Sequence, residues 1–108
     1  MPRFLIERDI PGAGAMTPEQ LAGATRQSNT VLAAMGADIQ WRHSYVAGDR
    51  IYCVYDAASE GLIREHAERS GFPASRITPV SAVIDPAFNA DEPAPEELRP
   101  REPATSIP

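Results

Sequence analysis

The segment at residues 41–56, WRHSYVAGDRIYCVYD, constrains the fold more than any other part of this chain. Two runs rich in aromatic and β-branched residues flank the dipeptide Gly48-Asp49, and this arrangement is typical of a β-hairpin. The segment also holds the only tryptophan, all three tyrosines, the only cysteine and one of the two histidines. We therefore expect the hairpin to carry both the centre of the fold and most of the chemically versatile side chains.

One helix is predicted on each side of the hairpin. The first begins at Thr17, whose hydroxyl can form a capping box with the side chain of Gln20, and it ends at Gly36. The second is capped by Ser59 and stops at Gly71. Both segments carry a small apolar face that suits packing on a sheet.

Strands are expected at Arg3–Asp9, in both arms of the hairpin and at residues 76–84. The resulting order of strand, helix, strand, strand, helix, strand is the split βαβ motif. We predict an α+β protein with the ferredoxin-like βαββαβ fold, in which right-handed crossovers place both helices on one face of a four-stranded antiparallel sheet. Pro79 lacks a backbone N–H, so the last strand should lie at a sheet edge.

The composition changes near residue 85, because six of the 11 prolines lie beyond it. That part of the chain is rich in proline and glutamate and has few apolar residues to offset the entropy of ordering. The sequence predicts one ferredoxin-like domain at residues 1–86 and a flexible tail at residues 87–108.

Charge and hydropathy exclude several classes of partner and location. The formal net charge of −5 argues against non-specific nucleic-acid binding, which depends on clustered basic residues. No apolar run approaches the roughly 20 residues of a membrane span, and the N-terminus lacks the apolar stretch of a signal peptide. A single cysteine cannot form an internal disulfide, which agrees with a reducing compartment. We expect a cytoplasmic protein without nucleic-acid or membrane partners.

The sheet is expected to be apolar on both faces, and two helices can cover only one. Simple alternation along the first arm of the hairpin assigns alternate residues to opposite faces: Ile39, Trp41, His43 and Tyr45 on one, and Gln40, Arg42, Ser44 and Val46 on the other. An uncovered apolar face of this size is rare in monomers. We therefore predict a homodimer that packs sheet against sheet.

His43, Cys53 and His66 are the candidate metal ligands, because imidazole and thiolate suit Ni, Cu or Zn. The alternative is that Cys53 is a small buried apolar residue and His66 a core histidine. An even-length turn at Gly48-Asp49 pairs Ser44 with Cys53 and sends His43 and Cys53 to opposite faces. A three-residue turn brings them to the same face, so both alternatives stay open.

Several short runs carry a resemblance to a known protein family. They are HSYV at 43–46, DRIYCVY at 49–55, IREHA at 63–67, GFPA at 71–74, RI at 76–77 and VIDP at 83–86. In these runs the chain resembles a family of small bacterial proteins of unknown function that are commonly described as nickel-binding. The resemblance implies a ferredoxin-like homodimer of the dimeric α+β barrel type, with nickel held by His43, Cys53 and His66.

Three functions follow as hypotheses. The first is a homodimeric metal-binding protein, with nickel as the metal, that stores, buffers or senses it. The second is a dimeric α+β barrel enzyme of monooxygenase or isomerase type with an apolar pocket lined by four residues: His43, Tyr45, Tyr52 and His66. The third is an interaction module whose tail recruits a partner. No pairing of a nucleophile with a base is readable, so the sequence favours a non-catalytic protein.

Overall fold

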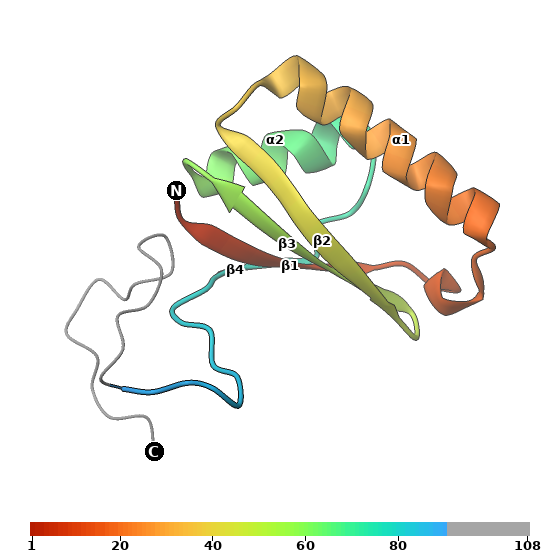
Figure 1. Ribbon diagram of the computed structural model, residues 1–108. Helices are drawn as coiled ribbons and strands as arrows, with labels where there is room; N and C mark the ends of the chain where they lie inside the picture. Colours follow the sequence, from red (N-terminus) through yellow and green to blue (C-terminus); the bar gives the residue numbers. More distant parts are fainter. Residues whose placement is uncertain (91–108) are drawn as a thin grey trace.

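The structure, a computed structural model, describes residues 1–90, so most of the predicted tail lies outside the described residues. The elements are β1 (Arg3–Asp9), the 3-10 turn η1 (Ala13–Ala15), α1 (Pro18–Met35), β2 (Ile39–Ala47), β3 (Arg50–Ala57), α2 (Glu60–Ser70) and β4 (Arg76–Pro79). They form an α+β unit with one four-stranded antiparallel sheet in the order β2-β3-β1-β4. Both helices lie on the same side of this sheet (Figure 1).

The helix ends follow local sequence signals. The Thr17 hydroxyl accepts a hydrogen bond from the Gln20 N–H at 3.2 Å, and the Gln20 side chain accepts one from the Thr17 N–H at 2.9 Å. The predicted capping box is therefore confirmed. Gly36 ends α1 at φ +88° and Gly71 ends α2 at φ +79°, both in the region that favours glycine. Ser59 occupies the predicted N-cap of α2, but its side chain makes no capping hydrogen bond within the described residues.

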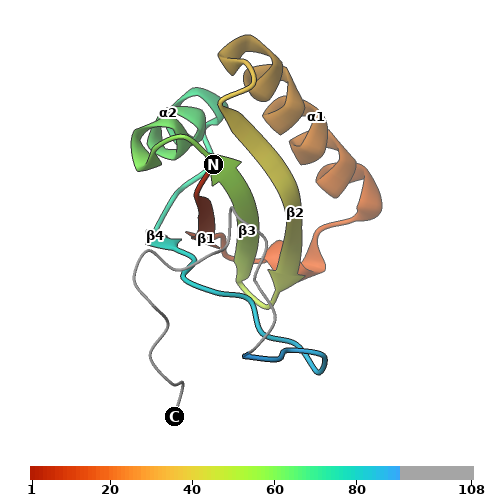
Figure 2. The ribbon, with the colours of Figure 1, turned by 60° about the vertical axis from the view of Figure 1, so that its left-hand side comes forward.

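The last strand is shorter than predicted. β4 ends at Pro79 rather than at residue 84, and it lies at the sheet edge as its proline requires. One further hydrogen bond, from the Val80 N–H to the Arg3 carbonyl at 2.8 Å, holds the chain to β1. Residues 81–90, which we call the C-terminal arm, then leave the sheet and run away from both helices (Figures 1 and 2).

The hairpin turn has the even length that the sequence left open. Ala47 pairs with Arg50 across a two-residue turn, and Gly48 has φ +60° whereas Asp49 does not have a positive φ. This pattern matches a type II′ turn, which needs glycine at its first central position. Ser44 consequently pairs with Cys53, which is the even-length register.

A β-bulge in β2 overturns the predicted alternation of side chains. Trp41 pairs with Tyr55 and His43 pairs with Val54, so Arg42 is an extra residue without its own partner on β3. Beyond the bulge every side chain changes face. The residues of β2 that face the helices are therefore Ile39, Trp41, Ser44 and Val46. His43 and Tyr45 point to the opposite side, which we call the open face, so the expectation that they share a face with Trp41 was wrong.

The core lies between the helices and the covered face of the sheet. Its buried apolar side chains come from β1, β2, β3 and α2: Phe4, Ile6, Ile39, Cys53, Tyr55, Ala57 and Ile63. On the inner face of α2, the side chains of Ile63, His66, Ala67 and Ser70 are all buried. None of the described helices has the length and apolar character that crossing a membrane requires.

Candidate functional site

The three predicted metal ligands lie on two sides of the sheet. His43 is exposed on the open face, whereas Cys53 is 5 % exposed and His66 is fully buried on the covered side. The even register separates His43 from Cys53 within one chain. Among residues 1–90, no three His, Cys, Asp or Glu side chains gather closely enough to hold a metal ion. The three-residue set therefore does not form a single site in one chain.

Cross-strand neighbours arrange the open face in rows. One row, which we call the apolar row for the aliphatic side chains of Val54 and Leu5 at its centre, runs His43, Val54, Leu5 and Thr78, and the next runs Tyr45, Tyr52, Glu7 and Arg76. The imidazole of His43 packs edge-on against the ring of Tyr45, with 5.1 Å between centroids. Tyr45 is 60 % exposed, so the two rings face solvent. The row of Tyr45 also contains the carboxylate of Glu7.

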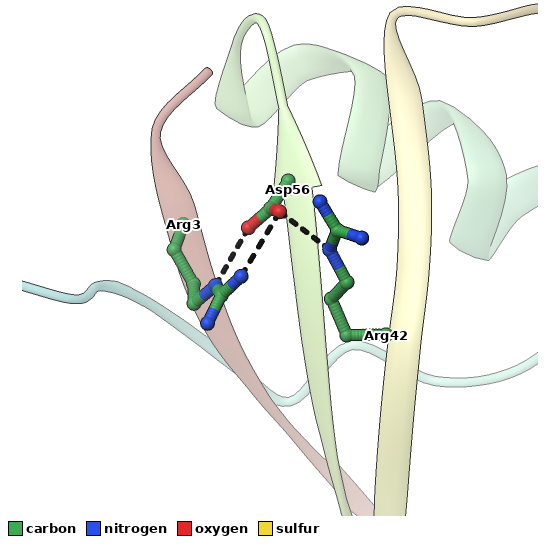
Figure 3. Close-up of polar contacts among 3 residues, drawn as sticks. All are labelled: Arg3, Arg42 and Asp56. Carbon is green, nitrogen blue, oxygen red and sulfur yellow. Dashed lines mark hydrogen bonds and ion pairs between the residues drawn. The ribbon is translucent and has the colours of Figure 1, made fainter. Parts of the chain in front are cut away.

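An ionic cluster of Asp56, Arg3 and Arg42 lies at one end of the open face (Figure 3). Asp56 accepts hydrogen bonds from the guanidinium of Arg3 at 2.7 and 3.1 Å and from that of Arg42 at 2.6 Å. Only 2 % of Asp56 is exposed because the two arginines cover it. Burial alone would raise the pKa of Asp56, but hydrogen bonds and positive charge from both arginines lower it below its ordinary value.

A second, looser ion-pair group lies at the hairpin end. Arg50 pairs with Asp9 at 2.8 Å and with Glu7 at 3.4 Å, and the guanidinium side chain is half exposed. Pairs this accessible to water contribute little to stability. They place charged groups of both signs at the hairpin end of the open face.

A buried arginine lies on the covered side of the sheet. The side chain of Arg8, 3 % exposed, donates from Nε to the Cys53 sulfur at 3.3 Å and from Nη1 to the Pro73 carbonyl at 3.0 Å. Its guanidinium also lies over the ring of Phe72, 6.0 Å from the centroid. The remaining nitrogen, Nη2, has no hydrogen-bond partner among the described residues.

His66 is held next to this arginine. Its Nε2 shares a 3.1 Å hydrogen bond with the Ser28 hydroxyl, and its ring packs against that of Tyr55 with 5.4 Å between centroids. Nδ1 has no partner among the described residues. Burial and the positive charge of Arg8 lower the pKa of His66, so the imidazole is held neutral. Burial likewise raises the pKa of Tyr55.

The two histidines therefore differ in their access to a metal ion. An exposed imidazole such as that of His43 can meet a metal ion from solution. Cys53 and His66 are covered by the helices and already contact Arg8 and Ser28, respectively. They fit the alternative in which both are core residues.

The pocket expected for an enzyme is not assembled as predicted. His43, Tyr45 and Tyr52 lie on the open face, whereas His66 lies on the covered side. The structure has a groove of about 540 Å³ elsewhere, between the C-terminal half of α2 and the following loop at residues 71–74, and none of the four residues lines it.

The sequence predicted neither the buried position of Arg8 nor the ionic cluster around Asp56. Arg8 continues the alternation of Phe4 and Ile6 onto the covered face, and this period-two pattern was the available signal. No comparable pattern indicates that Asp56 contacts Arg3 and Arg42, because the three residues lie on three different strands that meet only in the folded sheet.

Comparison with known proteins places the chain in a family. The family model described as nickel responsive protein SCO4226-like matches residues 4–80, which is more than half of the chain. This chain belongs to that family. The match confirms the resemblance inferred from the hairpin and the second helix. No curated protein sequence matches the chain.

The fold agrees with a solved structure of the same family. The crystal structure of SCO4226 from Streptomyces coelicolor A3(2) superposes with a TM-score of 0.63 at 22% sequence identity. The alignment covers 99% of that chain but 76% of this one. This member of the SCO4226-like family therefore has the α+β arrangement of its relative and additional residues that the relative lacks.

Proposed function

We propose that this protein binds nickel as a cytoplasmic homodimer and stores, buffers or senses the metal. Membership of a family named for its response to nickel is the observation that carries this proposal. The strand order β2-β3-β1-β4 with two helices on one face supports a ferredoxin-like subunit of a dimeric α+β barrel. The uncovered apolar row of the open face supports pairing with a second copy.

Of the three predicted ligands, His43 fits nickel best. Its imidazole is exposed on the open face, and the carboxylate of Glu7 lies on the same face, two strands away and paired with Arg50. One imidazole is too few for a tight site, but two copies packed through their open faces bring two sets of such groups toward each other. Ni²⁺ is well matched to imidazole with carboxylate or water as further ligands. Protons compete with the metal ion for an imidazole ligand, so nickel binding should weaken as pH falls.

Calorimetric titration with NiCl₂ tests the assignment of His43. We expect His43→Ala to weaken nickel binding at least tenfold, because the substitution removes the ligand without disturbing the core. His66→Gln is the matched control, since it removes the other histidine on the covered side and should leave nickel affinity unchanged. Circular dichroism checks that both variants fold. Wild-type nickel affinity in His43→Ala would remove this residue as a ligand.

A further inference from the structure

Arg8 is a buried positive charge for which the described residues supply no counter-ion. None of the ion pairs found among residues 1–90 involves it. The carboxylates of its neighbours Glu7 and Asp9 lie on the opposite face of β1 and pair with Arg50. A guanidinium does not lose its proton in proteins, so the charge cannot be removed by titration. Because an unpaired buried charge is costly, this side of the sheet favours an anion beside Arg8.

Two buried side-chain nitrogens in this region have no hydrogen-bond partner among the described residues. They are Arg8 Nη2 and His66 Nδ1. The other two guanidinium nitrogens donate to the Cys53 sulfur and the Pro73 carbonyl, so Nη2 is the donor left for a ligand. The two side chains lie near each other, since the positive charge of Arg8 contributes to the lowered pKa of His66. Buried polar groups are almost always paired in folded proteins, so both atoms indicate a place for a ligand.

The residues that cover Arg8 also line a groove. This groove of about 540 Å³ lies between the C-terminal half of α2 and the loop at residues 71–74. Phe72 and Pro73 belong to its wall. The same two residues contact the guanidinium, Phe72 through its ring at 6.0 Å and Pro73 through its carbonyl at 3.0 Å. Small-molecule sites commonly have volumes in this range. A ligand in the groove is therefore next to the residues that contact a buried positive charge.

The lining of the groove suits a ligand with an apolar body. Its apolar side chains are Ala67, Phe72, Pro73 and Ala74, and its charged ones are Arg64 and Glu68. These two charges are of opposite sign, and Arg64 is already paired with an acidic neighbour on α2. The surface of the groove itself therefore offers little that selects an anion. The guanidinium of Arg8 is the group that does.

Contact between a ligand and Arg8 Nη2 requires a movement of Phe72, because Arg8 itself does not line the groove. Phe72 is half-buried and lies in a loop whose neighbouring residues Gly71 and Pro73 are exposed. Its ring can therefore change rotamer at the edge of the core. The movement exchanges a cation–π contact for a charge-assisted hydrogen bond, which is the stronger interaction.

We propose that a small monocarboxylate with an apolar body binds in this groove, with a carboxylate oxygen accepting a hydrogen bond from Arg8 Nη2. His66 Nδ1 is a second donor in the same region in the tautomer that carries its proton there. The carboxylate supplies the negative charge that the described residues do not place beside Arg8. This site is independent of the proposed nickel binding, which uses His43 on the open face.

Titration with sodium benzoate, followed by ¹H–¹⁵N correlation NMR of the full chain, tests this site. Benzamide is the matched neutral probe, because it keeps the ring and lacks the charge. We expect benzoate to shift the backbone amides of the loop at residues 71–74 in a saturable manner. The Nε–H resonance of Arg8 should shift with them, and it is observable because this group is buried and hydrogen-bonded. Equal shifts with benzamide, or with sodium chloride at the same concentration, would overturn the proposal.

Two arginine variants test whether Arg8 provides the affinity. Arg8→Gln should weaken benzoate binding at least tenfold. Arg69→Gln is the matched control, because it removes the same charge from an exposed position of α2 outside the groove, and it should change the affinity less than twofold. Circular dichroism checks that both variants fold. If Arg8→Gln does not fold, the Nε–H resonance of the wild-type protein decides. Wild-type affinity in a folded Arg8→Gln, or an unshifted Nε–H at saturation, would overturn the proposal.

Discussion

Asp56 connects three strands through one carboxylate. It belongs to β3, Arg3 belongs to β1, and Arg42 is the extra residue of the β2 bulge. Both oxygens of Asp56 are used, with Arg3 binding in a bidentate manner. Because the carboxylate is almost fully buried, each arginine is more than a surface ion pair. The cluster also gives the bulge a reason, since the extra residue places Arg42 within reach of Asp56.

Replacing Asp56 with Asn should lower the free energy of unfolding by about 2–3 kcal/mol, near the lower end of the loss when a buried pair loses a partner. The arginines keep some access to water, which moderates the cost. Glu60→Gln breaks the exposed pair with Arg64 and should cost less than about 0.5 kcal/mol. Urea denaturation measures both. Equal stabilities of the two variants would show that the Asp56 cluster contributes no more than a surface pair.

Two glycines of α1 have opposite roles at the scale of the element. Gly36 ends the helix at φ +88° and ψ −163°, a conformation that a side chain strains. Gly23 lies inside the helix, and a Cβ placed there would meet only the end of the Arg26 side chain at an ordinary contact distance of 3.7 Å. The same substitution should therefore have opposite effects at the two positions.

We expect Gly36→Ala to destabilise the protein by about 1–2 kcal/mol, because alanine must adopt a positive φ. Gly23→Ala should stabilise it by about 0.5–1 kcal/mol, since alanine loses less backbone entropy in a helix. Thermal and urea unfolding report both changes. A destabilised Gly23→Ala together with an unaffected Gly36→Ala would contradict the assigned conformations.

The contrast between helices and hairpin shows what the sequence determines locally. Thr17, Gln20 and Gly36 act on neighbours within a few residues, so the bounds of α1 were predictable. The hairpin turn was recognisable at Gly48, but its length was not, because glycine suits both turn types. The bulge at Arg42 has no Gly or Pro signal and depends on Asp56, a partner on another strand.

The candidate site was only partly predictable for the same reason. Family membership could be inferred from runs in the hairpin and in the second helix. The face on which His43 lies depends on the bulge and on pairing between strands, so simple alternation grouped it with Trp41. Arg8 was visible as part of an alternating strand, but its burial against Cys53 and Pro73 requires the folded loop after α2.

At the scale of the molecule, the sheet separates two chemical environments. The covered side encloses Arg8, His66 and Tyr55, and burial there lowers the pKa of His66 and raises that of Tyr55. The open side carries His43 and the paired charges at its rim. Between pH 7.5 and 5.0, changes of pH should therefore act on stability through His66 on the covered side.

The neutral state of His66 predicts how stability depends on pH. Its pKa is lowered in the folded protein, whereas in the unfolded chain it should be about 6.5. Below this pH the unfolded chain binds a proton that the folded protein does not, so the free energy of unfolding should fall as pH decreases. The slope contributed by this one group is at most about 1.4 kcal/mol per pH unit. Well above pH 6.5 the contribution of His66 should be independent of pH.

Urea denaturation between pH 7.5 and 5.0 measures this dependence, in a window that lies above the titration of Asp56. His66→Gln is the appropriate comparison, because glutamine keeps polar atoms near Ser28 but does not titrate. We expect the variant to lose stability at pH 7.5, since the packing against Tyr55 is changed, and to lose less further stability on acidification than the wild type. Parallel pH profiles for wild type and His66→Gln would mean that another group controls acid sensitivity. A flattened profile would instead identify the covered side of the sheet as the part of the molecule where acid acts.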